Sequence, residues 1–174
     1  GDAASMDRAL AAAAASGARV AAHPSYPDRE GFGRRTLPIA APELGRSVED
    51  QCRALRTLAE ARGVVVETVK PHGALYHDLG KDPALADAFL DAVVRVFGAR
   101  VAIVGPPGSP FAARVALRGL AWIDEGFADR GYAADGSLLP RSTPGALLED
   151  PRAAAAQALA LAPAVSTLCV HGDT

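Results

Sequence analysis

The chain has 174 residues, of which 49% are hydrophobic and 22% are charged, and its net charge at pH 7 is −2. This length and composition suit one soluble domain with a substantial core. The mixed charge excludes a basic surface for nucleic acid and a polybasic patch for membranes, so small molecules or proteins are the expected partners. No apolar run approaches the roughly 20 residues of a membrane helix, and no signal peptide is recognisable, so the cytoplasm is the expected location.

The sequence of the first part of the chain predicts two helices with a short strand between them. Residues 3–16 are rich in Ala and precede a glycine, which indicates a helix, and residues 18–22 predict a strand that runs into His23. The following loop of about 20 residues is rich in Pro, Gly and charge, and this length suggests a functional role. Ser47 and the acidic residue three positions later resemble a capping box, which predicts the start of the second helix.

The next strand is the most informative one. Residues 64–70 begin with three valines, which predict a buried strand, and Pro71 must end it because proline cannot donate to a sheet. Alternate side chains of a strand share a face, so Lys70 and His72 are predicted to lie side by side if the chain stays extended. Beside other cations such as Arg130, His72 is expected to stay neutral and able to accept a proton.

The second half of the chain continues the alternation of helices and strands. Asp82-Pro83, Ser109-Pro110 and Asp150-Pro151 each predict a capped helix start. Apolar runs predict the remaining strands at residues 100–104, 120–124 and 165–170. Strands that are separated by helices of this length pair in parallel through right-handed crossovers, so the chain is predicted to have an α/β fold.

In parallel α/β folds, binding sites form where strands end at their carboxyl side. Three of the four histidines follow predicted strands. The polar residues at these strand ends are His23, Lys70, His72, Glu125, His171 and Asp173. We therefore predict that His23, His72 and His171 line one pocket, with Glu125 or Asp129 within reach.

The residue types at the strand ends suit hydrolysis. A histidine can act as a general base, a carboxylate can orient water, and Lys or Arg can stabilise an oxyanion. An acyl-enzyme route has little support, because no Ser lies in a G-x-S-x-G motif and neither Cys lies beside a His. His23, His72 and His171 are also candidate ligands for a divalent metal, although no local metal motif is present. The segment GPPGSP (105–110) lacks the Lys and Ser/Thr of a P-loop.

Four motifs, in order, closely resemble the LamB/YcsF family. They are AHPSYPDREGFGRR (22–35), VKPHGALYHDL (69–79), EGFADRGYAADGSLLPRS (125–142) and LCVHGDT (168–174). The resemblance implies an irregular β/α barrel like that of the glycoside hydrolase/deacetylase superfamily. Residues 1–174 would then be a single barrel domain that lacks some elements at both ends.

The resemblance also implies an activity. The family hydrolyses 5-oxoproline (pyroglutamate) to glutamate with ATP as co-substrate, as the A subunit of a complex with 5-oxoprolinase subunits B and C. The implied catalytic residues are Lys70, His72, Glu125, Asp129 and His171. The implied substrate or nucleotide ligands are His23, Tyr26, Arg34, Tyr76, Arg130, Arg141 and Asp173. Two alternatives are a metal-dependent deacetylase acting on carbohydrates or amides without ATP, and a non-catalytic protein that binds substrate or serves as a scaffold for its partners.

Overall fold

The computed structural model describes residues 2–172, and the chain divides into two compact units, residues 1–122 and 123–174. Each unit is described by itself, and the prediction of a single domain stays a prediction. Within the described residues, no helix is both long and apolar enough to cross a membrane.

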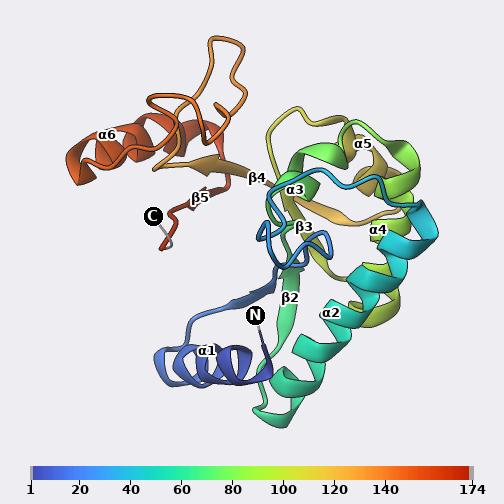
Figure 1. Cartoon of the computed structure of the whole chain (residues 1–174). Coiled ribbons are helices and arrows are strands. Elements are labelled where there is room, and N and C mark those ends of the chain that lie inside the picture. Colours follow the sequence, from blue (N-terminus) through green and yellow to red (C-terminus); the bar gives the residue numbers. More distant parts are fainter. Residues whose placement is uncertain (1, 173–174) are drawn as a thin grey trace. The chain divides into compact units, whose positions relative to one another are not determined.

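The first unit contains a parallel sheet and most of the helices (Figure 1). Its strands are β1 (Val20–Ala22), β2 (Val66–Val69) and β3 (Ala102–Gly105), and β2 pairs in parallel with both neighbours. Its helices are α1 (Ala3–Ser16), α2 (Ala41–Ala61), α3 (Ala74–Asp78), α4 (Pro83–Phe97) and α5 (Pro110–Leu117). Parallel strands joined by helices confirm the predicted α/β class.

The core of the first unit lies where α2 and α4 pack side by side against the sheet (Figure 1). Leu44 and Val48 of α2 are completely buried, as are Phe89 and Val93 of α4. Each pair has i,i+4 spacing, so each helix presents one apolar face. Val69 of β2 is also completely buried in this cluster. Burying a side chain of this size contributes about 1.5–3 kcal/mol, so the core fixes the strand whose end carries Lys70 and His72.

The described part of the second unit contains two parallel strands, one α-helix and a short 3₁₀ helix. Strand β4 (Ala121–Phe127), whose first two residues belong to the first unit, pairs in parallel with β5 (Thr167–Cys169). Helix α6 (Pro151–Leu161) and a short 3₁₀ helix (Ala162–Ala164) precede β5. The Gln157 amide of α6 donates to the carbonyl oxygens of Phe127, Ala128 and Arg130 at 2.8, 3.1 and 2.8 Å, which fixes the helix to the end of β4.

Three predicted helix starts are confirmed, and one is wrong. The side chains of Asp82, Ser109 and Asp150 each accept a hydrogen bond from a backbone N–H of the first turn. By contrast, α2 begins at Ala41, and Ser47 lies inside it, where it accepts from Gln51 at 3.2 Å. Proline in the first turn starts this helix without a side-chain cap, so the pattern at Ser47 was misleading.

The limits of all five predicted strands shift by one to three residues at one or both ends, and two of these shifts concern predicted site residues or the buried strand before them. Strand β2 begins at Val66, and Val65 is 69% exposed, so the prediction of a buried strand is wrong for the first valines. Strand β4 continues to Phe127 and therefore includes Glu125, which was predicted to follow it. Helix α3 was not predicted, because a helix of five residues is too short to show a periodic pattern.

Candidate functional site

The first unit brings His23, Lys70 and His72 together at the carboxyl ends of β1 and β2, as the strand-end rule predicts. The Nδ1 atom of His23 lies 2.7 Å from the carbonyl oxygen of Lys70, and its Nε2 atom lies 3.0 Å from Nδ1 of His72. The two rings meet edge to face, with centroids 4.8 Å apart. The two histidines therefore form a contacting pair.

The loop before α2 supports this histidine pair. Nε2 of His72 lies 2.8 Å from the carbonyl oxygen of Phe32, which has a left-handed φ of 55°. The carboxylate of Asp28 shapes the loop by accepting from the Gly31 N–H at 2.9 Å and from the Arg35 guanidinium at 2.6 and 2.9 Å. The hydrogen bonds from Arg35 and Gly31 lower the pKa of Asp28 to about 2. An ionised Asp28 thus holds the loop against His72.

Two glycines allow the loop to approach the end of β2. Gly73 has a φ of 61°, and a Cβ there would lie 2.3 Å from the carbonyl oxygen of Gly33. Gly33 itself has a φ of 66°, and its Cβ would lie 2.8 Å from Cβ of Ser25 and 3.2 Å from Cδ2 of His72. The N–H of Ala74 donates to the Gly33 carbonyl oxygen at 2.9 Å. The position of the histidine pair therefore depends on residues without side chains.

Two cationic side chains rest on aromatic rings near the histidine pair. Nζ of Lys70 lies 5.9 Å from the ring centroid of Tyr76, and the Arg34 guanidinium lies 5.0 Å from that of Phe32. Such cation–π contacts are worth about 0.5–1 kcal/mol at exposed sites. They hold both cations at this end of the first unit, where an anion would be favoured.

Tyr26 lies in the core of the first unit. It is 1% exposed, its hydroxyl donates to Asp78 at 3.2 Å, and burial raises its pKa. Asp78 also accepts from Thr36 at 2.6 Å and from Lys81 at 3.0 Å. In the described conformation Tyr26 and Asp78 connect three segments of the chain, and a binding role for Tyr26 stays a prediction. Asp78 was not predicted as a site residue, although it lies in the second motif.

The second unit places Asp129 and His171 together after β4 and β5. The His171 N–H donates to the Asp129 carboxylate at 2.7 Å, and Nδ1 lies 3.0 Å from both carboxylate oxygens. Burial raises the pKa of Asp129, but the hydrogen bonds from His171 lower it by more, so its net shift is downward. The ring of Phe127 stacks on His171 with centroids 5.7 Å apart.

This geometry defines which nitrogen of His171 can accept a proton. The ionised Asp129 can only accept hydrogen bonds, so Nδ1 of His171 carries the hydrogen. In the neutral ring, Nε2 then carries the lone pair. A carboxylate that fixes the tautomer of an imidazole in this way is a common arrangement for a general base.

The remaining predicted residues of the second unit have different surroundings. Arg130 is 7% exposed, and its guanidinium donates to the carbonyl oxygens of Ala146 at 3.0 Å and Leu139 at 2.6 Å, which folds the segment between β4 and α6. Glu125 is buried within β4. Arg141 lies half-buried in a turn of the same segment. Asp173 lies outside the described residues.

The described residues contain no group of three or more His, Cys, Asp or Glu side chains that could hold a metal ion. His23 and His72 each direct one nitrogen to a carbonyl oxygen, and His171 directs Nδ1 to a carboxylate. Metal binding by His23, His72 and His171 therefore stays a prediction. The predicted pocket shared by all three histidines stays a prediction, because His171 belongs to the second unit.

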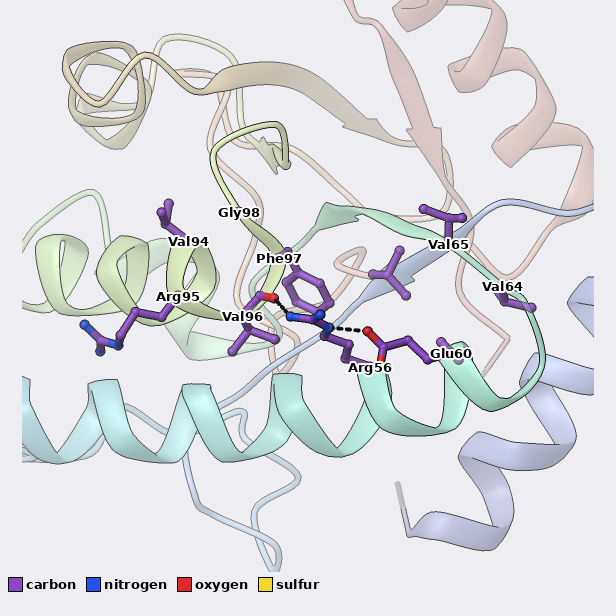
Figure 2. A pocket seen from close by; sticks show the side chains of 11 residues that line it. Arg56, Glu60, Val64, Val65, Val94, Arg95, Val96, Phe97 and Gly98 are labelled. Carbon is purple, nitrogen blue, oxygen red and sulfur yellow. Dashed lines mark hydrogen bonds and ion pairs between the residues drawn. The ribbon is translucent and has the colours of Figure 1, made fainter.

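A hollow of about 520 Å³ lies at the opposite, amino end of β2. Figure 2 shows that Val64, Val65 and Phe97 line it together with Arg56. The Arg56 guanidinium donates to Glu60 at 2.6 Å and to the carbonyl oxygen of Val96. None of the predicted site residues lines this hollow.

The fold and the strand-end residues define an α/β protein with polar groups at the carboxyl ends of parallel strands. A model of the LamB/YcsF family matches residues 1–174, so the chain belongs to the LamB/YcsF family.

Relatives of known name cover the whole chain. The A subunit of 5-oxoprolinase from Streptomyces griseus subsp. griseus is 42% identical over an alignment of 188 positions, which covers 100% of this chain and 75% of the relative. That of Symbiobacterium thermophilum is 43% identical over 99% of this chain and 71% of its own length. A crystal structure of the lactam utilization protein from Thermus thermophilus is 34% identical, with a TM-score of 0.90 over 98% of this chain and 74% of that one.

Proposed function

We propose that this chain is one component of an ATP-dependent 5-oxoprolinase, which hydrolyses 5-oxoproline to glutamate. The observation that carries the proposal is the identity of 42% to a relative named as the A subunit of 5-oxoprolinase, over the full length of the chain. The similarity to a lactam utilization protein supports the same chemical class, because 5-oxoproline is a lactam.

Coupling to ATP suits this substrate because a lactam is a stable amide. In the proposed route, ATP phosphorylates the carbonyl oxygen, and water then adds to the carbonyl carbon. The C–N bond breaks as the nitrogen takes up a proton, and a second water hydrolyses the resulting acyl phosphate to release phosphate. The reaction needs a group that moves protons and a cation that stabilises negative charge.

The described residues include both kinds of group. We assign proton transfer to His171, whose Nδ1–H is held by Asp129 and whose Nε2 carries the lone pair in the neutral ring. We assign the charge of the substrate carboxylate or of a phosphate to Lys70, at the end of β2. The relatives are named as the A subunit of their enzyme, which supports the presence of partner subunits, and we take these to be subunits B and C.

The test is reconstitution of the complex. The purified chain is combined with subunits B and C and incubated with 5-oxoproline and ATP, and glutamate and ADP are measured. Parallel reactions omit ATP or this chain. We expect glutamate and ADP only in the complete mixture. Absence of glutamate from the full assembly would contradict the proposal, as would glutamate formation without ATP or without this chain.

A further inference from the structure

The hydrogen bonds of His23 and His72 determine how many protons their four ring nitrogens carry. A backbone carbonyl oxygen can only accept, so Nδ1 of His23 must donate to Lys70 and Nε2 of His72 must donate to Phe32. The two remaining nitrogens, Nε2 of His23 and Nδ1 of His72, face each other at 3.0 Å. Two neutral rings with these outer N–H groups would present two lone pairs to each other.

A hydrogen bond between the facing nitrogens requires one more proton. A neutral imidazole carries one N–H and an imidazolium carries two, so the pair must hold three protons on its four nitrogens. We infer that His23 and His72 share this third proton and act as one unit with a single positive charge. The inference depends on the hydrogen bonds of the four ring nitrogens and on their distances.

Some groups near the pair favour binding of the third proton, and others disfavour it. The ionisable residues of the segments in contact with the pair come from the loop, the end of β2 and α3; they are Tyr26, Asp28, Arg29, Glu30, Arg34, Arg35, Lys70, Tyr76, His77 and Asp78. Asp28 is paired with Arg35, so the cations Lys70 and Arg34 disfavour the extra charge. The shared hydrogen bond favours it, because a hydrogen bond to a charged donor is stronger than one between neutral groups.

The shared proton changes the predicted role of His72. With Nε2 donating to Phe32 and Nδ1 bonded to His23, the ring presents no nitrogen that could accept a proton from water. It differs in this respect from His171. In the proposed 5-oxoprolinase, on which this consequence rests, the pair would supply fixed positive charge at the strand ends, and proton transfer would fall to His171.

Nuclear magnetic resonance of the full chain with ¹⁵N-labelled histidine tests the proton count directly. Long-range ¹H–¹⁵N correlations distinguish protonated from unprotonated ring nitrogens, and His77→Gln assists the assignment. At pH 7 we expect three protonated nitrogens on His23 and His72, with both rings titrating in one coupled step. Two protonated nitrogens, with independent titration of the rings, would overturn the inference, as would a bound metal ion in the purified chain.

The variant His23→Gln keeps a hydrogen bond to His72 but removes the positive charge of the shared proton. In His23→Gln, the side-chain amide can donate to Nδ1 of His72 without adding charge. His72 should then keep only its Nε2–H at pH 7, and the coupled titration should disappear. Unchanged titration of His72 in this variant would contradict a shared proton. These measurements use neither substrate nor partner subunits, so they can fail while 5-oxoprolinase turnover is observed, and the reverse also holds.

Discussion

Replacing Gly73 by alanine should destabilise the first unit by disturbing the contact between the loop and β2. The new Cβ would lie 2.3 Å from the carbonyl oxygen of Gly33, and that carbonyl accepts the Ala74 N–H. The backbone of Gly73, with a φ of 61° and a ψ of −130°, lies outside the left-handed helical region and costs a residue with a side chain about 1–3 kcal/mol. Losing the hydrogen bond adds about 0.5–1.5 kcal/mol. The expected loss of unfolding free energy is therefore about 1.5–4.5 kcal/mol, measured by urea denaturation.

Gly63→Ala is the matched control for this experiment. Gly63 has a φ of 65°, close to that of Gly73, but a Cβ there would meet no atom within 4 Å. It should therefore cost only the backbone strain, about 1–2 kcal/mol. If the two variants lose equal free energy at equal denaturant slopes, the close approach of Gly73 to Gly33 does not control the stability of this loop, and the reasoning is refuted.

Three further predictions concern the buried polar contacts. Asp129→Asn should lower the unfolding free energy by about 1–3 kcal/mol and the rate of glutamate formation by about 100-fold or more. Asp135→Asn, on an exposed turn, is the control and should change neither quantity. Equal effects of the two variants would contradict the role of Asp129 in holding His171. The folded pKa of Asp28, about 2, lies below its ordinary 3.8, so its contribution to stability is present above about pH 4 and is lost as the pH falls toward 2. Urea midpoints of Asp28→Asn should accordingly fall less steeply over that range than those of wild type or of Asp50→Asn, and parallel curves would contradict this. Tyr26→Phe should cost about 0.5–1.5 kcal/mol in the same assay because it removes the buried bond to Asp78, and an unchanged midpoint would contradict a structural hydroxyl.

Local signals in the sequence predicted much of the fold. The pairs Asp82-Pro83, Ser109-Pro110 and Asp150-Pro151 mark helix starts because the capping side chain and the proline both favour the first turn. The start of α2 was not predictable in this way. Ala40 provides no side-chain cap, and packing of the helix against α4 extends it beyond the local signal at Ser47.

The candidate site was predictable at the level of strand ends. Chain direction places polar residues that follow parallel strands at one edge, which brought His23 and His72 together. Their hydrogen bonds were not predictable. The tautomer of His72 depends on the carbonyl oxygen of Phe32, which reaches it only because the Asp28 loop folds back and Gly33 and Gly73 lie close together. The expectation of a neutral His72 considered only nearby cations and not the ring of His23.

The most direct test of the proposed function is glutamate formation by a reconstituted complex that contains Lys70→Met. Loss of a cation that stabilises the transition state should cost about 2–4 kcal/mol, or roughly 30- to 1,000-fold in kcat/KM. Lys81→Met is the control, because the Lys81 side chain is 72% exposed, and its buried partner Asp78 also accepts hydrogen bonds from Tyr26 and Thr36. We expect the Lys70→Met complex to lose turnover and the Lys81→Met complex to retain it. Wild-type turnover by the Lys70→Met complex would contradict the account and favour a scaffold role for this chain.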